Sequence, residues 1–207
     1  MFIDYTEEQR DLRARLRTYF EGLFTPELRE ELKTSEGGTP EYSRALKKMG
    51  ADGWLGIGWP KEFGGQERPF IEQFIFYDEV QRAGFPIPFL TLNTVGPTLA
   101  KFGSRQQRDF YLPKILKGEL HFTIGYTEPS AGTDLASLKT TAVRDGDQYV
   151  INGQKVFSSL AHFADYMWLA CRTDPTVSKH KGISLIIVPA NAPGVSQTPI
   201  ETMGDNK

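Results

Sequence analysis

The spacing of apolar residues changes once along this chain, near His121. Before that point apolar residues recur every three or four positions, as Leu12 and Leu16 do, which is the pattern of amphipathic helices. After it, apolar segments are short and turn sequences separate them, as in strands. Helices followed by a run of strands indicate an α+β chain of two domains, because alternating βαβ units would mix the two patterns. We therefore expect an all-α domain over residues 1–120 and a β domain over residues 121–207.

Local signals place helices in the first half of the chain. Two capping boxes occur, in which a hydroxyl and a glutamine side chain can bond the backbone N–H groups that a first turn leaves unpaired. They are Thr6 with Gln9 and Ser104 with Gln107. Residues 53–65 hold too many glycines for regular structure. Further helices are expected to begin at Pro40 and to span about 70–83 and 92–102.

The second half predicts strands joined by tight turns. The expected strands span residues 122–127, 140–144, 148–157, 166–172 and 183–189. Asp145-Gly146-Asp147 is typical of a β-hairpin turn, because glycine accepts the positive φ that such turns require. Asn152-Gly153 favours another tight turn for the same reason.

The composition excludes several classes of function. With a net charge of −2 and no basic run, nothing favours a nucleic-acid partner. Cys171 is the only cysteine, so no internal disulfide forms, and the histidines have no metal-binding spacing. No stretch approaches the ~20 apolar residues of a membrane helix. The first residues are acidic where a secretory signal would be apolar, so we expect a cytoplasmic protein.

Residues 124–134 form the segment most suggestive of ligand binding. A short apolar strand runs into a turn in which Pro129 fixes one φ and Gly132 lacks a side chain. Hydroxyl residues flank the turn at Thr127 and Thr133. Such a loop lets a ligand approach backbone N–H groups closely. An ordinary strand-end turn has the same composition, so these residues alone leave both interpretations open.

A second segment, residues 149–159, joins the first in a recognisable pattern. It runs through Asn152-Gly153-Gln154-Lys155 to Phe157 and two serines. In this order and at this distance the two segments resemble the flavin-binding middle domain of the acyl-CoA dehydrogenase family. The positions that meet the family's signature are Gly125, Thr127, Glu128, Ala131, Gly132, Thr133, Asp134 and Ser137. Tyr126 departs from it, since the family has an aliphatic residue there.

The resemblance extends over nearly the whole chain and implies its fold. Residues 53–65 resemble a glycine-rich turn of the family's helical N-terminal domain, and residues 104–120 resemble the helix that leads into the flavin strand. Residues 165–174 and 182–189 resemble the next strands. The resemblance implies a helical N-terminal domain followed by a β-barrel or β-sandwich middle domain that binds FAD.

The resemblance also implies roles for individual residues. Thr127, beside Tyr126, corresponds to the residue that bonds the polar edge of the flavin. Gly132 and Thr133 correspond to the pair beside the FAD pyrophosphate, with Thr133 also near the thioester and CoA end of the substrate. The acyl pocket is implied near Ile87 and Leu90.

Two further cofactor residues follow from the second segment. Phe157 holds the position of an aromatic residue that packs near the isoalloxazine, where the family usually has tryptophan, so the smaller ring leaves room for water or a bulkier substrate. Ser159 matches a threonine whose hydroxyl lies near flavin N5. From the sequence alone Phe157 also reads as a strand core residue. The assignment fails if Thr127 and Ser159 lie on unrelated surfaces.

The catalytic base implied by the resemblance is a glutamate in a third, helical domain. We expect it beyond Lys207, so that this chain by itself holds FAD poorly and turns over nothing. Glu128 is the right type of residue for a base, but the resemblance places it in the binding loop.

The implied activity is α,β-dehydrogenation of an acyl-CoA thioester in fatty-acid or steroid side-chain catabolism. Tyr126, Phe157 and Ser159 resemble subfamily members that act on ring-bearing CoA thioesters as two-gene assemblies. The implied partners are an electron-transferring flavoprotein and further subunits of a homotetramer or heterotetramer. Two alternatives remain: a catalytically silent partner subunit, and an oxygen-using oxidase or monooxygenase on the same scaffold.

Overall fold

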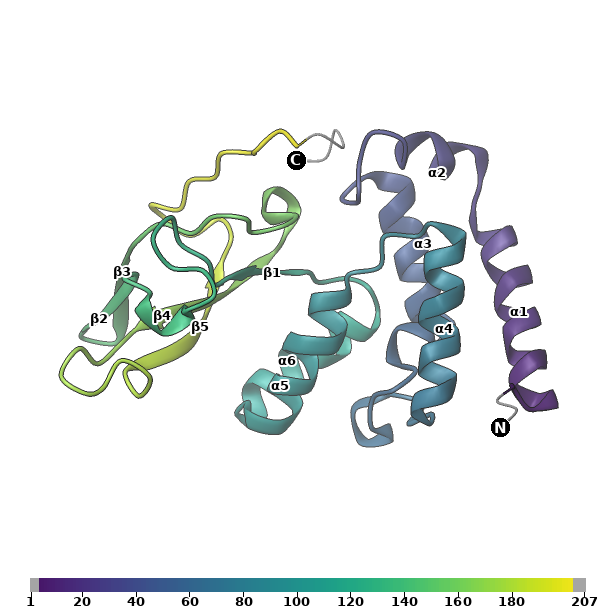
Figure 1. Ribbon diagram of the computed structural model, residues 1–207, viewed down its shortest axis with the longest axis horizontal. Helices are drawn as coiled ribbons and strands as arrows, with labels where there is room; N and C mark the ends of the chain where they lie inside the picture. The colour runs from purple at the N-terminus through teal and green to yellow at the C-terminus, as the bar shows by residue number, and fades with distance from the viewer. Residues whose placement is uncertain (1–3, 203–207) are drawn as a thin grey trace. The chain divides into compact units, whose positions relative to one another are not determined.

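The computed structural model describes residues 4–202, and these fall into two compact units. Residues up to Leu120 form a helical unit, and residues from His121 form a unit built on a β-sheet (Figure 1). The predicted fold class, a helical region followed by a β domain, is therefore confirmed. We describe each unit by itself.

The first unit consists of helices. Its helices are α1 (Glu7–Leu23), α2 (Pro26–Glu31), α3 (Pro40–Ala51), α4 (Phe70–Ala83), α5 (Gly96–Phe102) and α6 (Arg105–Leu116), with a π-helix over Thr91–Val95. Both predicted capping boxes form: the Thr6 hydroxyl accepts from the Gln9 N–H, and the Ser104 hydroxyl accepts from the Gln107 N–H. The sequence reading missed α2, and it treated the π-helix and α5 as one helix.

Helix α1 packs on α4 through apolar side chains and one buried carboxylate. The rings of Phe20 and Phe76 lie 6.3 Å apart in this core. Glu79 is 2% exposed and accepts from Arg13 Nε at 2.6 Å and Arg17 Nε at 2.9 Å. Burial raises the pKa of Glu79, but the two guanidinium groups outweigh it and lower the pKa below its usual value. The pairing lets a carboxylate occupy an otherwise apolar interface.

The glycine-rich segment 53–65 is ordered by Trp59. The indole is buried and donates from Nε1 to the Leu92 carbonyl at 2.9 Å. Gly96 packs directly against the indole ring, so that a Cβ at this position would overlap it. Short 3₁₀ turns over Trp54–Gly56 and Lys61–Phe63 are the only regular structure in this segment of the described chain, as its glycine content predicted.

The second unit is one five-stranded sheet. Its strands are β1 (Phe122–Gly125), β2 (Thr141–Asp145), β3 (Gln148–Asn152), β4 (Tyr166–Arg172) and β5 (Ile183–Pro189). β4 is central: it pairs in parallel with β1 and antiparallel with β5, while β2 joins its far end through Thr141 and Arg172. Within the described residues the sheet is not closed into a barrel, so that detail of the predicted β domain is wrong while its class holds.

The hairpin between β2 and β3 turns where the sequence predicted. Asp145 pairs with Gln148, and Gly146 adopts the expected positive φ of 59°. The second predicted turn, at Asn152-Gly153, is wrong: β3 ends at Asn152 and the chain runs on without a turn. Gly153 is instead required by close packing, because a Cβ there would lie 2.6 Å from the Cβ of Thr140.

Both faces of β4 are covered by small apolar side chains. Leu169 and Cys171 pack with Ala142 on one face. Ala170, on the opposite face, packs with Ala131 and Leu138. Ala131 and Leu138 both belong to the loop after β1, so this face of the sheet fixes the loop that holds the predicted site.

Candidate functional site

The loop after β1 is folded into a short closed turn. The N–H of Glu128 donates to the Ala131 carbonyl at 2.8 Å, and the N–H of Ala131 donates back to the Glu128 carbonyl at 3.1 Å. Ala131 is buried against the sheet, whereas Gly132 and Thr133 are exposed. The turn is therefore anchored on one side and offers its next residues to solvent.

The structure brings the two predicted segments side by side. The Val156 N–H donates to the Thr127 carbonyl at 2.9 Å. The Thr123 hydroxyl, on β1, donates to the Ser159 carbonyl at 2.9 Å. The backbones of residues 123–127 and 156–159 therefore run close together.

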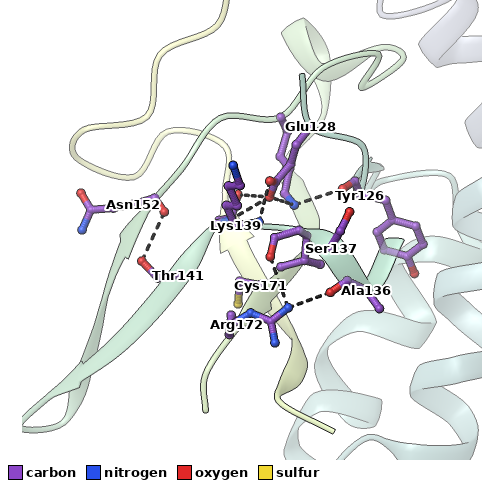
Figure 2. A network of polar contacts seen from close by, with 12 residues as sticks. Tyr126, Glu128, Ala136, Ser137, Lys139, Thr141, Asn152, Cys171 and Arg172 are labelled. Atoms are coloured by element: carbon purple, nitrogen blue, oxygen red, sulfur yellow. Dashed lines mark hydrogen bonds and ion pairs between the residues drawn. The ribbon is translucent and has the colours of Figure 1, made fainter. Parts of the chain in front are cut away.

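A buried ion pair ties these segments together (Figure 2). Lys155 and Glu128 meet at 2.9 Å, with side chains only 6% and 4% exposed. The Glu128 carboxylate also accepts from the backbone N–H of Lys139 at 2.6 Å, the N–H of Thr140 at 2.8 Å and the Thr140 hydroxyl at 2.6 Å. Burial raises the pKa of Glu128, but the bonds from Thr140, Lys155 and Lys139 outweigh it and lower the pKa to about 2.

The chemical consequence is that Glu128 is committed to structure. A carboxylate that accepts four hydrogen bonds and has a pKa near 2 stays ionised and holds no proton near neutral pH. A base this weak takes up a proton poorly near neutral pH, so Glu128 is unsuited to act as a general base.

The segment around Ser158 carries backbone strain. Phe157 and Leu160 adopt φ values of 56° and 59°, which cost about 1–2 kcal/mol each for residues with a Cβ. Phe157 is 77% exposed, so it is no strand core residue of the described unit. The Ser158 hydroxyl is buried and has no partner among residues 4–202. This segment thus combines two residues with unfavourable φ values and one unpaired buried hydroxyl.

The backbone N–H groups of Gly132 and Thr133 are a second unpaired feature of the site. Neither N–H donates to a backbone or side-chain acceptor within residues 4–202, and a Cβ at Gly132 would meet no atom within 4 Å. Further along the same loop, the carbonyls of Ala136 and Leu138 accept from Arg172 Nη2 at 2.8 Å and 3.3 Å (Figure 2). Free, rigidly held N–H groups of this kind suit an anionic group such as a phosphate.

The remaining predicted residues are placed as follows. Ile87 is half-buried and Leu90 is exposed, and both precede the π-helix of the first unit. Among the described residues no group of acidic, histidine or cysteine side chains is arranged to hold a metal ion. None of the helices in residues 4–202 has the length and apolarity needed to cross a membrane.

Family comparisons agree with this geometry. Residues 123–207 match the family model described as acyl-CoA dehydrogenase, middle domain, and residues 6–119 match the N-terminal domain of the same family. The chain belongs to the acyl-CoA dehydrogenase family. The sequence resemblance is thereby confirmed, and membership places the two loops of the β unit in the middle domain of an oxidoreductase family.

Individual acyl-CoA dehydrogenases are closely similar over this chain. Acyl-CoA dehydrogenase FadE29 of Mycobacterium tuberculosis is 60% identical over 97% of this chain and 51% of its own length, and FadE26 of the same organism is 55% identical over 98% and 52%. The structure titled Tcur3481-Tcur3483 steroid ACAD has a TM-score of 0.93 at 56% identity, covering all of this chain and 54% of its own. The ChsE4-ChsE5 complex from Mycobacterium tuberculosis has a TM-score of 0.92 at 56% identity, covering 98% and 52%. This acyl-CoA dehydrogenase chain thus spans about half the length of the relatives it matches.

Sequence reasoning missed the side chains that hold the site together. Lys155 was noted as part of the Asn-Gly-x-Lys element, but its contact with Glu128 lies 27 positions away in sequence. The available signal was two opposite charges, each next to residues expected in strands. Arg172 gave no signal, because arginine at a strand end is ordinarily exposed.

Proposed function

We propose that this chain supplies the N-terminal and middle domains of an FAD-dependent acyl-CoA dehydrogenase that forms an α,β double bond in an acyl-CoA thioester. The observation that carries the proposal is the bond between the Val156 N–H and the Thr127 carbonyl, at 2.9 Å. This bond joins the loop after β1, which has free N–H groups at residues 132–133, to the segment that holds the exposed Phe157 and the unpaired Ser158 hydroxyl. Family membership supports the reaction class.

The features of the β unit fit FAD. The free N–H groups of Gly132 and Thr133 would bind the pyrophosphate, because fixed dipoles suit an anion. Tyr126 and Thr127 would lie at the polar edge of the isoalloxazine. When bound, the flavin supplies the acceptor for the hydride that leaves the β-carbon.

The remaining cofactor roles concern the second segment. The exposed ring of Phe157 would pack near the isoalloxazine and exclude water, and the hydroxyl of Ser159 would lie near its N5. The removal of the α-proton requires a carboxylate basic enough to accept it, and the buried Glu128, with a pKa of about 2, is too weak a base. We place that base in the half of the relatives' length that this sequence does not span.

We propose a ring-bearing acyl group as substrate. The structure titled Tcur3481-Tcur3483 steroid ACAD is 56% identical to this chain, which supports a shared substrate class. Phe157, where the family usually has tryptophan, leaves more space beside the flavin. Thr133 would contact the thioester and CoA end, while Ile87 and Leu90 would line the acyl pocket.

We also propose assembly with a second, related subunit, with electrons passing to an electron-transferring flavoprotein. The ChsE4-ChsE5 title describes a complex of two proteins, and that structure is 56% identical to this chain. If the base resides only in the partner, this subunit is catalytically silent, which is the second candidate function. Mutation of the candidate base glutamate in each subunit in turn shows whether the active base lies in this protein or only in the partner.

The test uses the protein expressed from its complete reading frame, alone and with its partner. Flavin content is measured by absorbance after gel filtration, followed by anaerobic bleaching with ring-bearing and linear acyl-CoA thioesters. We expect stoichiometric FAD and faster bleaching by the ring-bearing thioester. Ser159→Ala should slow bleaching, whereas Ser178→Ala, at an exposed serine outside both segments, should not. Absence of FAD from all forms refutes the proposal, and rapid reoxidation by oxygen favours an oxidase.

A further inference from the structure

Lys155 bonds to more than its carboxylate partner. Its ammonium group donates to Glu128 Oε1 at 2.9 Å and to the backbone carbonyl of Tyr126 at 3.1 Å. The side chain is 6% exposed, so the charge is almost entirely removed from water. A buried ammonium is retained only where acceptors compensate its lost hydration, and here a carboxylate and a carbonyl do so.

The position of the ammonium group is fixed from outside the site. The bonds that Glu128 accepts from Lys139 and Thr140 attach its carboxylate to the start of β2. These bonds hold the Glu128 carboxylate in place, and the carboxylate in turn holds the Lys155 ammonium group within bonding distance of the Tyr126 carbonyl. The Tyr126 carbonyl and the Glu128 carboxylate, both labelled in Figure 2, accept from this ammonium group.

The bond to Tyr126 determines how the next N–H is presented. No peptide bond in the described residues is cis, so the N–H of Thr127 points away from the carbonyl that Lys155 holds. That N–H has no acceptor within residues 4–202, whereas the Thr127 carbonyl is occupied by Val156. A charged donor on the carbonyl polarises the peptide and strengthens its N–H as a donor.

We propose that Lys155, held by Glu128, is a positioning residue that orients the Tyr126–Thr127 peptide and strengthens the Thr127 N–H as a donor to the bound flavin. Reduction adds negative charge to the ring, so a strengthened N–H donor favours the reduced flavin over the oxidised one. Lys155 would therefore raise the reduction potential of the flavin as well as its affinity. The inference rests on the proposed FAD binding.

The test separates this role from that of a simple structural ion pair. The double variant Glu128→Gln/Lys155→Met removes both charges at similar volume, which avoids leaving one buried charge unpaired. Lys139→Met is the matched control, because it deletes a positive charge whose exposed side chain does not bond Tyr126. Thermal unfolding, FAD affinity and flavin potential are measured for each full-length protein, with FAD loaded for the potential.

We expect the double variant to unfold cooperatively near the wild-type temperature but to bind FAD at least tenfold more weakly. Binding of the reduced flavin should weaken tenfold more than that of the oxidised flavin, which lowers the two-electron potential by about 30 mV. Lys139→Met should match the wild type in both FAD affinity and flavin potential. A double variant that holds FAD at the wild-type potential refutes the inference while leaving the proposed function standing.

A measurement on the wild type covers the case in which the double variant does not fold. Amide hydrogen exchange of Thr127 should be fast in the apoprotein and at least tenfold slower with FAD bound, because the N–H then has an acceptor. Unchanged exchange on FAD binding overturns the inference. A wild type that binds no FAD overturns the proposed function and this inference together.

Discussion

Gly132 is the position where stability and ligand binding should respond in opposite ways. A Cβ added there meets no atom within 4 Å, and the residue does not have a positive φ. Gly132→Ala should therefore leave the free energy of unfolding unchanged or raise it by up to about 1 kcal/mol, because alanine restricts the unfolded chain. The open space that makes the substitution harmless to the fold is the space we assign to the FAD pyrophosphate.

The expected loss of affinity can be measured through stability. A methyl group against the approaching phosphate should weaken FAD binding at least tenfold, or about 1.4 kcal/mol. At an FAD concentration of about 100 times the wild-type Kd, the wild type gains about 2.7 kcal/mol of stability and the variant about 1.4 kcal/mol. Urea unfolding with and without FAD gives both quantities, and calorimetric titration checks the affinity directly.

Gly153→Ala should have the opposite effect on stability: it should destabilise the fold. A Cβ there would lie 2.6 Å from the Cβ and 2.7 Å from the Cα of Thr140, so the neighbouring strand must shift. The free energy of unfolding should fall by about 1–3 kcal/mol even without FAD.

If Gly132→Ala binds FAD as tightly as the wild type, the pyrophosphate does not lie against the loop after β1 and the assignment of Gly132 is refuted.

Three further predictions follow from other contacts. The pKa of Glu128 is lowered from 4.5 to about 2, so its stabilisation is complete above the unfolded value and is lost as the pH falls from 4.5 toward 2. At about 1.4 kcal/mol per pH unit this amounts to about 3 kcal/mol, and urea midpoints of the wild type and Glu128→Gln should converge over that range. Gly96→Ala should lower the stability of the helical unit by about 1–3 kcal/mol because the methyl overlaps the Trp59 ring, whereas Gly22→Ala, with no atom within 4 Å, should be neutral or slightly stabilising by thermal unfolding. Phe157→Trp should change the unfolding free energy by less than about 0.5 kcal/mol, because the side chain is 77% exposed, yet reduce kcat/KM for ring-bearing more than for linear thioesters. Equal losses for both thioesters would contradict the assigned role of Phe157.

Features encoded within a few residues could be read from the sequence. The capping boxes at Thr6 and Ser104 form as predicted, since each needs only a hydroxyl and a glutamine three positions apart. The hairpin turn at Gly146 depends on the φ of one residue. The strands over 166–172 and 183–189 were predicted to the residue, because apolar runs bounded by turn formers define them. The family could be recognised for a related reason, since its signature lies in short contiguous segments.

Features that depend on distant segments were decided only by the tertiary structure. Gly153 suggested a turn, yet it is glycine because the backbone passes against Thr140, 13 positions away. Within residues 4–202 the sheet is open, which depends on which strands pair with β4 and not on any strand's own pattern. The contact of Lys155 with Glu128 and the Tyr126 carbonyl could not be seen from spacing, because a buried ion pair is identified by what surrounds both charges. The sequence alone thus determined the kinds of elements and their order. Their pairing, and the charges that hold the two loops together, come from packing between segments far apart in the chain.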